Sequence, residues 1–217
     1  MRIAILVEGE TEQAFMPKLR DFLKVHLHGR MPKLDPVAYD GRIPTGDKLQ
    51  RVVTRLLDCG AQSADVVIAL TDVYTGTREF VNAADAKNKM RQWVGVEPRF
   101  FPHVAQHDFE SWLLPFWSDI QRLAGHNRAA PAGNPELVNH TRPPAYHLKD
   151  MYRTGAKGKA YVKPRDAGRI LRDNDLLVAA RACAELKDFL NTILEQCAAL
   201  KINANGTDVE PIEEIKP

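Results

Sequence analysis

The sequence has few cysteines, no long apolar run and almost no net charge, and each shortage argues against a class of protein. Three cysteines in 217 residues, without a Cys-x-x-Cys spacing, give no sign of a disulfide scaffold or a zinc site. No apolar run approaches the roughly 18–20 residues that span a bilayer. The opening MRIAILVEGE reaches two acids after about six apolar residues, which is not the pattern of a signal peptide. We therefore expect a cytoplasmic protein without membrane association.

The few cysteines predict a reducing compartment. Cys183 and Cys197 are expected on one helix, about 21 Å apart, which is beyond disulfide reach. We expect both, together with Cys59, to be small core residues. The net charge of +2 indicates no partner, so any nucleic-acid signal has to be local.

Short apolar runs alternate with amphipathic segments through the first half of the chain. Such alternation predicts a mostly parallel sheet flanked by helices, a Rossmann-like α/β fold. The runs 2–7 and 65–70 are apolar after their first residues, Arg2 and Asp65, so we expect Ile3–Val7 and Val66–Leu70 to be neighbouring interior strands. Pro102 favours an edge position or a bend for the strand that contains it. The expected strands are 2–7, 34–39, 65–70 and 99–105, and the expected helices are 11–27, 47–58, 79–93 and 109–117.

The composition changes after about residue 125. The stretch 125–144 is rich in proline and glycine and predicts a long irregular connection. Helices are expected at 145–152, 164–172 and 176–200. We predict an α/β core over 1–124, a basic helical elaboration packed on it over 125–200, and a flexible tail over 201–217.

Two apolar strands end in acids. Glu8 follows the first run and Asp72 follows the run 65–70. Ligands of open parallel sheets bind at the carboxyl ends of the strands, although an acid there can also only begin a loop or cap a helix. The two acids together favour a shared acidic site. Glu110 is the third candidate, because it stands in an otherwise apolar segment where a carboxylate needs a partner or a metal.

Several stretches in order resemble a known family. They are VEGETEQAF from Val7, Thr71 to Tyr74 with Gly76, RFFPH from Arg99, HDFESWLL from His107, Asn134 to Glu136, and Tyr161 to Lys163. The chain resembles a Toprim-like bacterial family, number 4276 among the domains of unknown function, over about residues 1–195. This family is related to the Toprim nucleases of the overcoming-lysogenization-defect type.

The resemblance implies a Toprim fold and Mg²⁺- or Mn²⁺-dependent work on a phosphodiester. Glu8 matches the Toprim residue of general acid–base catalysis, and Asp72 matches the first Asp of the metal-binding pair. Tyr74 stands where the second Asp is expected, and a phenol is a poor substitute for a carboxylate. Glu110 is then the natural replacement for the missing second Asp as a metal ligand. We therefore expect Glu8, Asp72 and Glu110 to be catalytic and metal-ligating, with four residues around them: Glu12, Tyr74, His107 and Asp108.

The segment 142–172 is strongly basic, with nine Lys or Arg against two Asp. Cations bind phosphates, and the interleaved Tyr146, Tyr152 and Tyr161 are of a type that stacks on bases, although a basic segment can also be only a solvated face. The residues expected to bind nucleic acid are Lys149, Arg153, Lys157, Lys159, Lys163 and Arg165.

Together these features predict a metal-dependent nuclease that acts on nucleic acid, with DNA favoured over RNA. By analogy it acts in anti-phage defence beside a partner ATPase, and it can form a homo-oligomer. Two alternatives remain. One is a non-catalytic Toprim-like subunit that binds nucleic acid or a partner protein, which Tyr74 favours. The other is a small-molecule phosphohydrolase that uses the same acids.

Overall fold

The computed structural model describes residues 1–27, 31–73, 79–138, 142–156, 158–199 and 212. The predictions made for Tyr74 and Lys157, and for all of the tail except Ile212, lie outside these residues. No helix in the described ranges is both long and apolar enough to cross a membrane.

Four strands form one parallel sheet in the order β2-β1-β3-β4. β1 (Arg2–Val7) and β3 (Val66–Asp72) are the interior pair, as their apolar sequences predict, and both are almost fully buried. β2 (Lys33–Ala38) and β4 (Phe100–Ala105) are the edges, and Pro102 lies in an edge strand as predicted. The α/β prediction is therefore confirmed.

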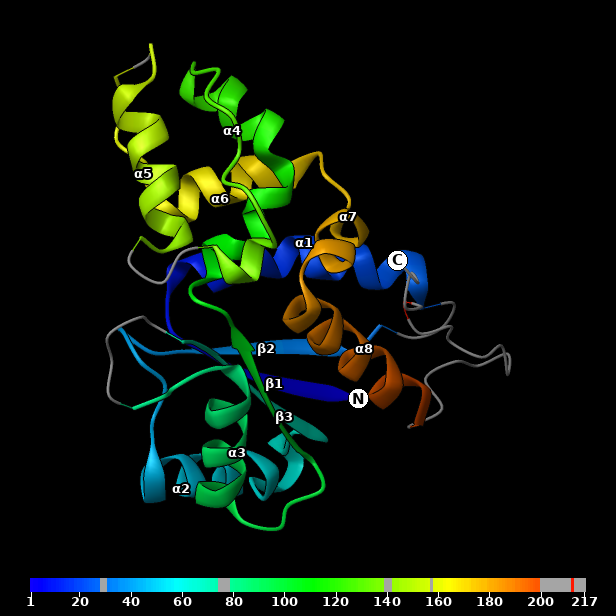
Figure 1. Ribbon diagram of the computed structural model, residues 1–217. Coiled ribbons are helices and arrows are strands. Elements are labelled where there is room, and N and C mark those ends of the chain that lie inside the picture. Colours follow the sequence, from blue (N-terminus) through cyan, green and yellow to red (C-terminus); the bar gives the residue numbers. More distant parts are fainter. Residues whose placement is uncertain (28–30, 74–78, 139–141, 157, 200–211, 213–217) are drawn as a thin grey trace.

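Helices cover both faces of the sheet (Figure 1). α1 (Glu10–His26) lies on one face, and α2 (Gly46–Leu57) and α3 (Ala83–Val94) lie on the other. Because side chains alternate along a strand, Ile5 and Ile68 pack toward α1, whereas Leu6 and Ala69 pack toward α2 and α3. Two separate hydrophobic clusters result, one on each face.

The second half of the chain is helical. Its 3₁₀ helices are η2 (Phe109–Phe116) and η3 (Pro135–Leu137), and its α-helices are α4 (Trp117–Ala124), α5 (Pro144–Thr154), α6 (Lys163–Arg172), α7 (Leu176–Ala182) and α8 (Ala184–Ala199). A further 3₁₀ helix, η1 (Gly60–Gln62), lies in the first half between α2 and β3. The single helix expected over 109–117 is thus a 3₁₀ helix that continues into α4. α8 packs on the α1 side of the sheet beside β4, and α6 packs along α1 (Figure 1).

Two predictions about cysteine-containing segments are wrong. The helix expected over 176–200 is interrupted at Cys183, whose backbone is extended and whose thiol points at the carbonyl oxygen of Ser111, 3.7 Å away. The carboxylate of Glu136 then accepts the backbone N–H of Glu185 at 3.0 Å, and so caps the new helix α8. Cys59 is exposed in the turn after α2, whereas Cys183 and Cys197 are buried as expected.

The strand order reverses between β1 and β3. The chain leaves β1 toward β2 on one side and returns through α2 to β3 on the other. In open parallel sheets, the carboxyl ends of the strands beside such a reversal form a crevice. Glu8 and Asp72 lie at these two ends, so the topology brings the two predicted acids together.

Candidate carboxylate site

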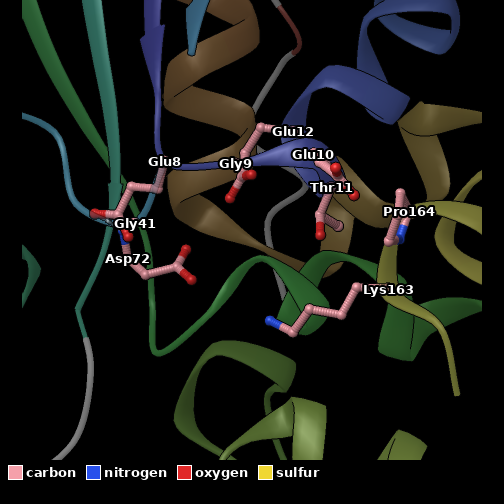
Figure 2. A pocket seen from close by; sticks show the side chains of 9 residues that line it. All are labelled: Glu8, Gly9, Glu10, Thr11, Glu12, Gly41, Asp72, Lys163 and Pro164. Atoms are coloured by element: carbon pink, nitrogen blue, oxygen red, sulfur yellow. Dashed lines mark hydrogen bonds between the residues drawn. The ribbon is translucent and has the colours of Figure 1, made fainter. Parts of the chain in front are cut away.

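A pocket of about 250 Å³ opens at the carboxyl ends of β1 and β3. Figure 2 shows carboxylates from two strands and a helix around it, with a lysine from α6 reaching in from the opposite side. The lining residues are Glu8, Gly9, Glu10, Thr11, Glu12, Gly41, Asp72, Lys163 and Pro164.

Glu8 is fixed by the strand register. Leu6 pairs with Ala69, so Glu8, two residues on, faces Thr71. The Thr71 hydroxyl donates to Oε1 of Glu8, and the backbone N–H of Asp72 donates to the same oxygen at 3.3 Å. Burial raises the pKa of Glu8 to about 7, although the Thr71 hydrogen bond opposes the shift, and the Glu12 carboxylate adds to it. Glu8 therefore titrates near neutral pH.

Asp72 is the last residue of β3, and its carboxyl group is buried among other acids. Burial raises its pKa well above the ordinary value, and Glu12, Glu8, Asp108 and Glu110 each raise it further. The sequence had pointed to Glu8, Asp72 and Glu110, and the charges of Glu8 and Glu110 both act on the Asp72 carboxyl group.

Glu12 comes from the first turn of α1, directly after β1. We had expected it beside the site, but its side chain is 5% exposed and lines the pocket itself. Its pKa is raised by burial and then by the Glu110 carboxylate. Glu12 is therefore as much a member of the cluster as the three acids predicted to be catalytic.

Asp108 and Glu110 lie at the start of η2, and neither is among the residues that line the pocket. The backbone N–H of Ala145, in the first turn of α5, donates to Oδ2 of Asp108 at 3.1 Å, while Oδ1 is buried without a hydrogen-bond partner in the structure described. Burial and then the Glu110 charge raise the pKa of Asp108 to about 7. Asp108 was expected beside the site, and it is a buried acid at the N-cap position of η2.

Lys163 supplies positive charge to these acids. Its Nζ lies 3.1 Å from Oε1 of Glu110, which is fully buried, and the Tyr161 hydroxyl donates to the same oxygen at 3.4 Å. Burial alone would lower the pKa of Lys163, but the Glu110 and Asp72 carboxylates outweigh it and the pKa is raised. The sequence prediction placed Lys163 among the nucleic-acid-binding cations. Among the basic residues of 142–172, only Lys163 lies in one of the stretches that resemble the Toprim-like family, and this was the only signal that distinguished it.

The remaining predicted residues lie away from the pocket lining. His107 is buried next to Asp108. Among the expected nucleic-acid ligands, Lys149, Arg153, Lys159 and Arg165 are exposed; Arg153 pairs with Asp150 at 2.5 Å and Arg165 with Asp166 at 2.7 Å.

The donor chemistry of the cluster fits a hard cation. Burial first, and repulsion between the acids second, raise the pKa values of Glu8, Asp72 and Asp108. Mg²⁺ and Mn²⁺ prefer oxygen ligands, and a divalent ion would relieve the repulsion. As the side chains stand, no group of three or more potential ligands within the described residues is arranged around one point. Asp72, Glu8 and Glu12 line the pocket and are the residues that would hold the ion.

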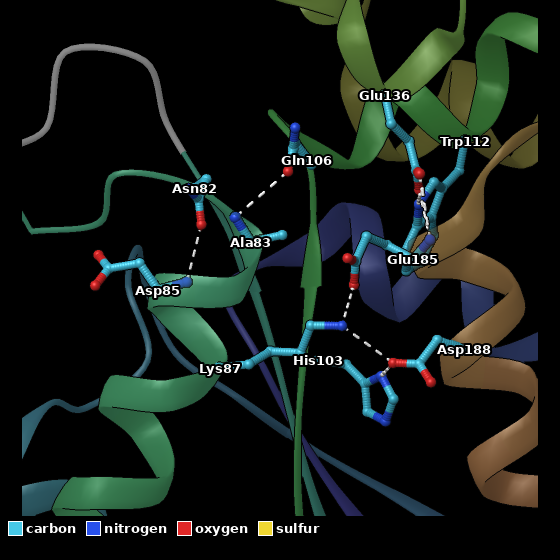
Figure 3. A network of polar contacts seen from close by, with 10 residues as sticks. All are labelled: Asn82, Ala83, Asp85, Lys87, His103, Gln106, Trp112, Glu136, Glu185 and Asp188. Carbon is cyan, nitrogen blue, oxygen red and sulfur yellow. Dashed lines mark hydrogen bonds and ion pairs between the residues drawn. The ribbon is translucent and has the colours of Figure 1, made fainter.

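A second polar network joins α3, β4 and α8 (Figure 3). Lys87 bridges Glu185 at 2.6 Å and Asp188 at 3.1 Å. Nδ1 of His103 lies 3.4 Å from Asp188, but burial lowers the pKa of His103 to about 4, so the ring is neutral. This network connects α8 to α3 and to the edge strand β4, and none of its residues lines the carboxylate pocket.

A family model agrees with the resemblance in the sequence. The family model described as Domain of unknown function (DUF4276) matches residues 7–194. A search of curated proteins finds no match. Among solved structures, the C-terminal region of the Burkholderia pseudomallei OLD protein superposes with a TM-score of 0.49 and 12% identity, over 90% of this chain and 97% of that chain. The corresponding region of the Xanthomonas campestris pv. campestris OLD protein gives a TM-score of 0.41 and 14% identity, over 89% and 97%.

Proposed function

This chain belongs to the DUF4276 family, and from that premise we propose that it is a metal-dependent phosphodiesterase that cleaves nucleic acid. The observation that carries the proposal is the gathering of Glu8, Glu12 and Asp72 in one pocket at the strand-order reversal, opposite Lys163. Buried acids with raised pKa values are typical of catalytic sites.

Asp72 is the central metal ligand of the proposal, with Glu8 and Glu12 beside it. A divalent ion bound there supplies positive charge for the phosphate and lowers the pKa of an attacking water. The Toprim-like stretches that contain Glu8 and Asp72 support the same assignment.

Glu8 is suited to move a proton. A carboxylate whose pKa is about 7 is partly ionised at neutral pH and can both accept and return a proton. The Thr71 hydroxyl holds one of its oxygens, which leaves the other for a water. Lys163 is placed to meet a phosphate that enters the pocket, and Tyr161 helps to hold its partner Glu110.

The test is a cleavage assay with labelled single- and double-stranded DNA and RNA, in Mg²⁺, in Mn²⁺ and in EDTA. We expect cleavage that needs the metal and is lost in Glu8→Gln and Asp72→Asn. Glu195→Gln, an exposed acid on α8, is the matched control and should cleave like the wild type. No cleavage of any of these substrates would contradict the proposal. Hydrolysis of a small phosphomonoester alone would favour a phosphohydrolase.

One observation favours a second candidate, a non-catalytic subunit that binds nucleic acid or a partner. The ion pair between Lys163 and Glu110 partly balances the buried acids without any metal. In that case the wild type would bind nucleic acid in EDTA and never cleave it.

The finer parts of the proposal concern substrate and context. We propose DNA rather than RNA as the substrate, action beside a partner ATPase, and a role in defence against phage. The cleavage assay with and without a co-purified ATPase tests the first two, and phage plating on cells with and without Asp72→Asn tests the third.

A further inference from the structure

The solvent-facing side of α5 carries cations and an aromatic ring. One side of this helix, which includes Leu148 and Met151, is fully buried. The opposite side presents Tyr146, Lys149, Asp150 and Arg153, which recur at helical spacing. Arg142, just before the helix, and Arg128 lie against these residues.

Contacts with two neighbouring side chains hold the Tyr146 ring in place, which suits a ring on which a base stacks. The guanidinium of Arg142 lies 5.2 Å from its ring centroid, and the ring of His147 meets it edge-on with centroids 5.9 Å apart. Tyr146 is nevertheless 42% exposed, so it keeps ring surface for a base. Tyr152 and Tyr161, which the sequence offered for the same role, are 4% and 8% exposed and belong to the core.

Asp150 aligns two of the cations. Its Oδ1 accepts a hydrogen bond from Arg153 at 2.5 Å, and its Oδ2 accepts one from Arg128. The face thus carries the four cations Arg128, Arg142, Lys149 and Arg153 along with this carboxylate, and it retains an excess of positive charge. Such a surface attracts a phosphate backbone.

The N-terminal end of α5 contacts an acid of the cluster, Asp108. The Ala145 backbone N–H, one residue before Tyr146, donates to Asp108 of the acidic cluster. A strand that follows α5 toward its N-terminus is therefore led to the acids.

We propose that this face of α5 binds single-stranded nucleic acid, with a base stacked on Tyr146 and the backbone along Lys149 and Arg153, and guides the strand to the pocket. The inference rests on the proposed function and adds the substrate class to it. The ring selects single strands because the bases of a duplex are already stacked on one another, whereas every unpaired base offers a free face.

The test measures binding by fluorescence anisotropy, in EDTA, with a labelled oligonucleotide and with its duplex. Tyr146→Ala should weaken single-strand binding about 5- to 150-fold and leave duplex binding unchanged, because a stacked base contributes about 1–3 kcal/mol. Tyr146→Phe keeps the ring and should bind like the wild type. Circular dichroism confirms that each variant is folded.

The salt dependence separates stacking from charge. Tyr146→Ala should leave the slope of log affinity against log salt unchanged, whereas Arg153→Gln should reduce it by about 0.7 for a single strand. Arg51→Gln, an exposed arginine of α2 on the other side of the sheet, is the control and should change neither quantity (Figure 1).

Three results would overturn the inference. Tyr146→Ala could bind the single strand as tightly as the wild type does, or it could lose as much affinity for the duplex as for the single strand. The wild type could also bind neither the single-stranded oligonucleotide nor its duplex. Because these measurements need no metal, they are independent of cleavage. If the wild type cleaves but Tyr146 is dispensable for binding, only this inference fails. If Tyr146 is needed for binding but nothing is cleaved, only the phosphodiesterase proposal fails.

Discussion

Lys163 Nζ lies 3.1 Å from one oxygen of Glu110 and 3.2 Å from the other, so an ammonium group of α6 is shared by both oxygens of a fully buried carboxylate. Removing one partner of such a pair leaves an uncompensated buried charge. The pair therefore joins the helical half of the chain to the acids beside the sheet.

Lys163→Met should destabilise the protein by about 3 kcal/mol, measured by urea unfolding at neutral pH. The double variant Lys163→Met with Glu110→Gln should recover part of this loss, because neither charge remains. Lys159→Met, an exposed lysine nearby, should stay within about 0.5 kcal/mol of the wild type. If Lys163→Met and Lys159→Met changed the free energy of unfolding equally, the Lys163–Glu110 ion pair would not contribute to stability.

The acidic cluster should make the metal-free protein less stable as pH rises. The pKa values of Glu8 and Asp108 in the folded protein are about 7, above their ordinary values of 4.5 and 3.8. Their protonated forms therefore favour folding below the unfolded pKa values, and this contribution is lost as pH rises through 7. In EDTA we expect the free energy of unfolding to fall by about 1–3 kcal/mol between pH 5 and 8.

Glu8→Gln and Asp108→Asn should each flatten this pH profile, because an amide cannot ionise. The measurement is urea unfolding at several pH values. A stability that rises from pH 5 to pH 8 in EDTA would contradict the predicted direction.

Divalent metal should raise the melting temperature at pH 8. An ion that binds only the folded state stabilises it by about 2.7 kcal/mol at a hundred times its dissociation constant. Asp72→Asn should abolish the rise measured with Mg²⁺ or Mn²⁺ by differential scanning fluorimetry. Glu195→Gln should show the full rise, and an undiminished rise in Asp72→Asn would remove Asp72 from the metal site.

Two glycines should respond in opposite directions to alanine. A Cβ at Gly155, just after α5, would lie 2.1 Å from the carbonyl oxygen of Ala124, the last residue of α4. Gly155→Ala should therefore destabilise the protein by about 2 kcal/mol or more. Gly168, inside α6, has open space around it, so Gly168→Ala should stabilise by about 1 kcal/mol. Thermal unfolding of Gly155→Ala and Gly168→Ala tests both predictions.

The strands and two of the acids were predictable because their signals are local. A continuous apolar run indicates a buried parallel strand, and the acid that follows it must lie at the carboxyl end of the sheet. This reasoning predicts β1 with Glu8 and β3 with Asp72 from the sequence alone. The edge position of β4 followed from Pro102 in the same way.

The position of Lys163 in the site was not predictable, because it depends on how α6 packs along α1. In the sequence Lys163 is one cation among nine, and only tertiary packing turns it toward Glu110. The burial of Tyr152 and Tyr161 has the same origin. The helix break at Cys183 depends on Glu136, an acid 49 residues before the amide that it caps.

The order in which the chain is synthesised gives the Lys163–Glu110 pair one more consequence. Glu8, Glu12, Asp72 and Glu110 have all been made when the ribosome has passed β4 and η2, but Lys163 is added 53 residues after Glu110. A sheet that formed during that interval would hold its acids without the lysine that balances them. Charge balance in the pocket is therefore a late event of biosynthesis, and it is completed only when α6 reaches α1.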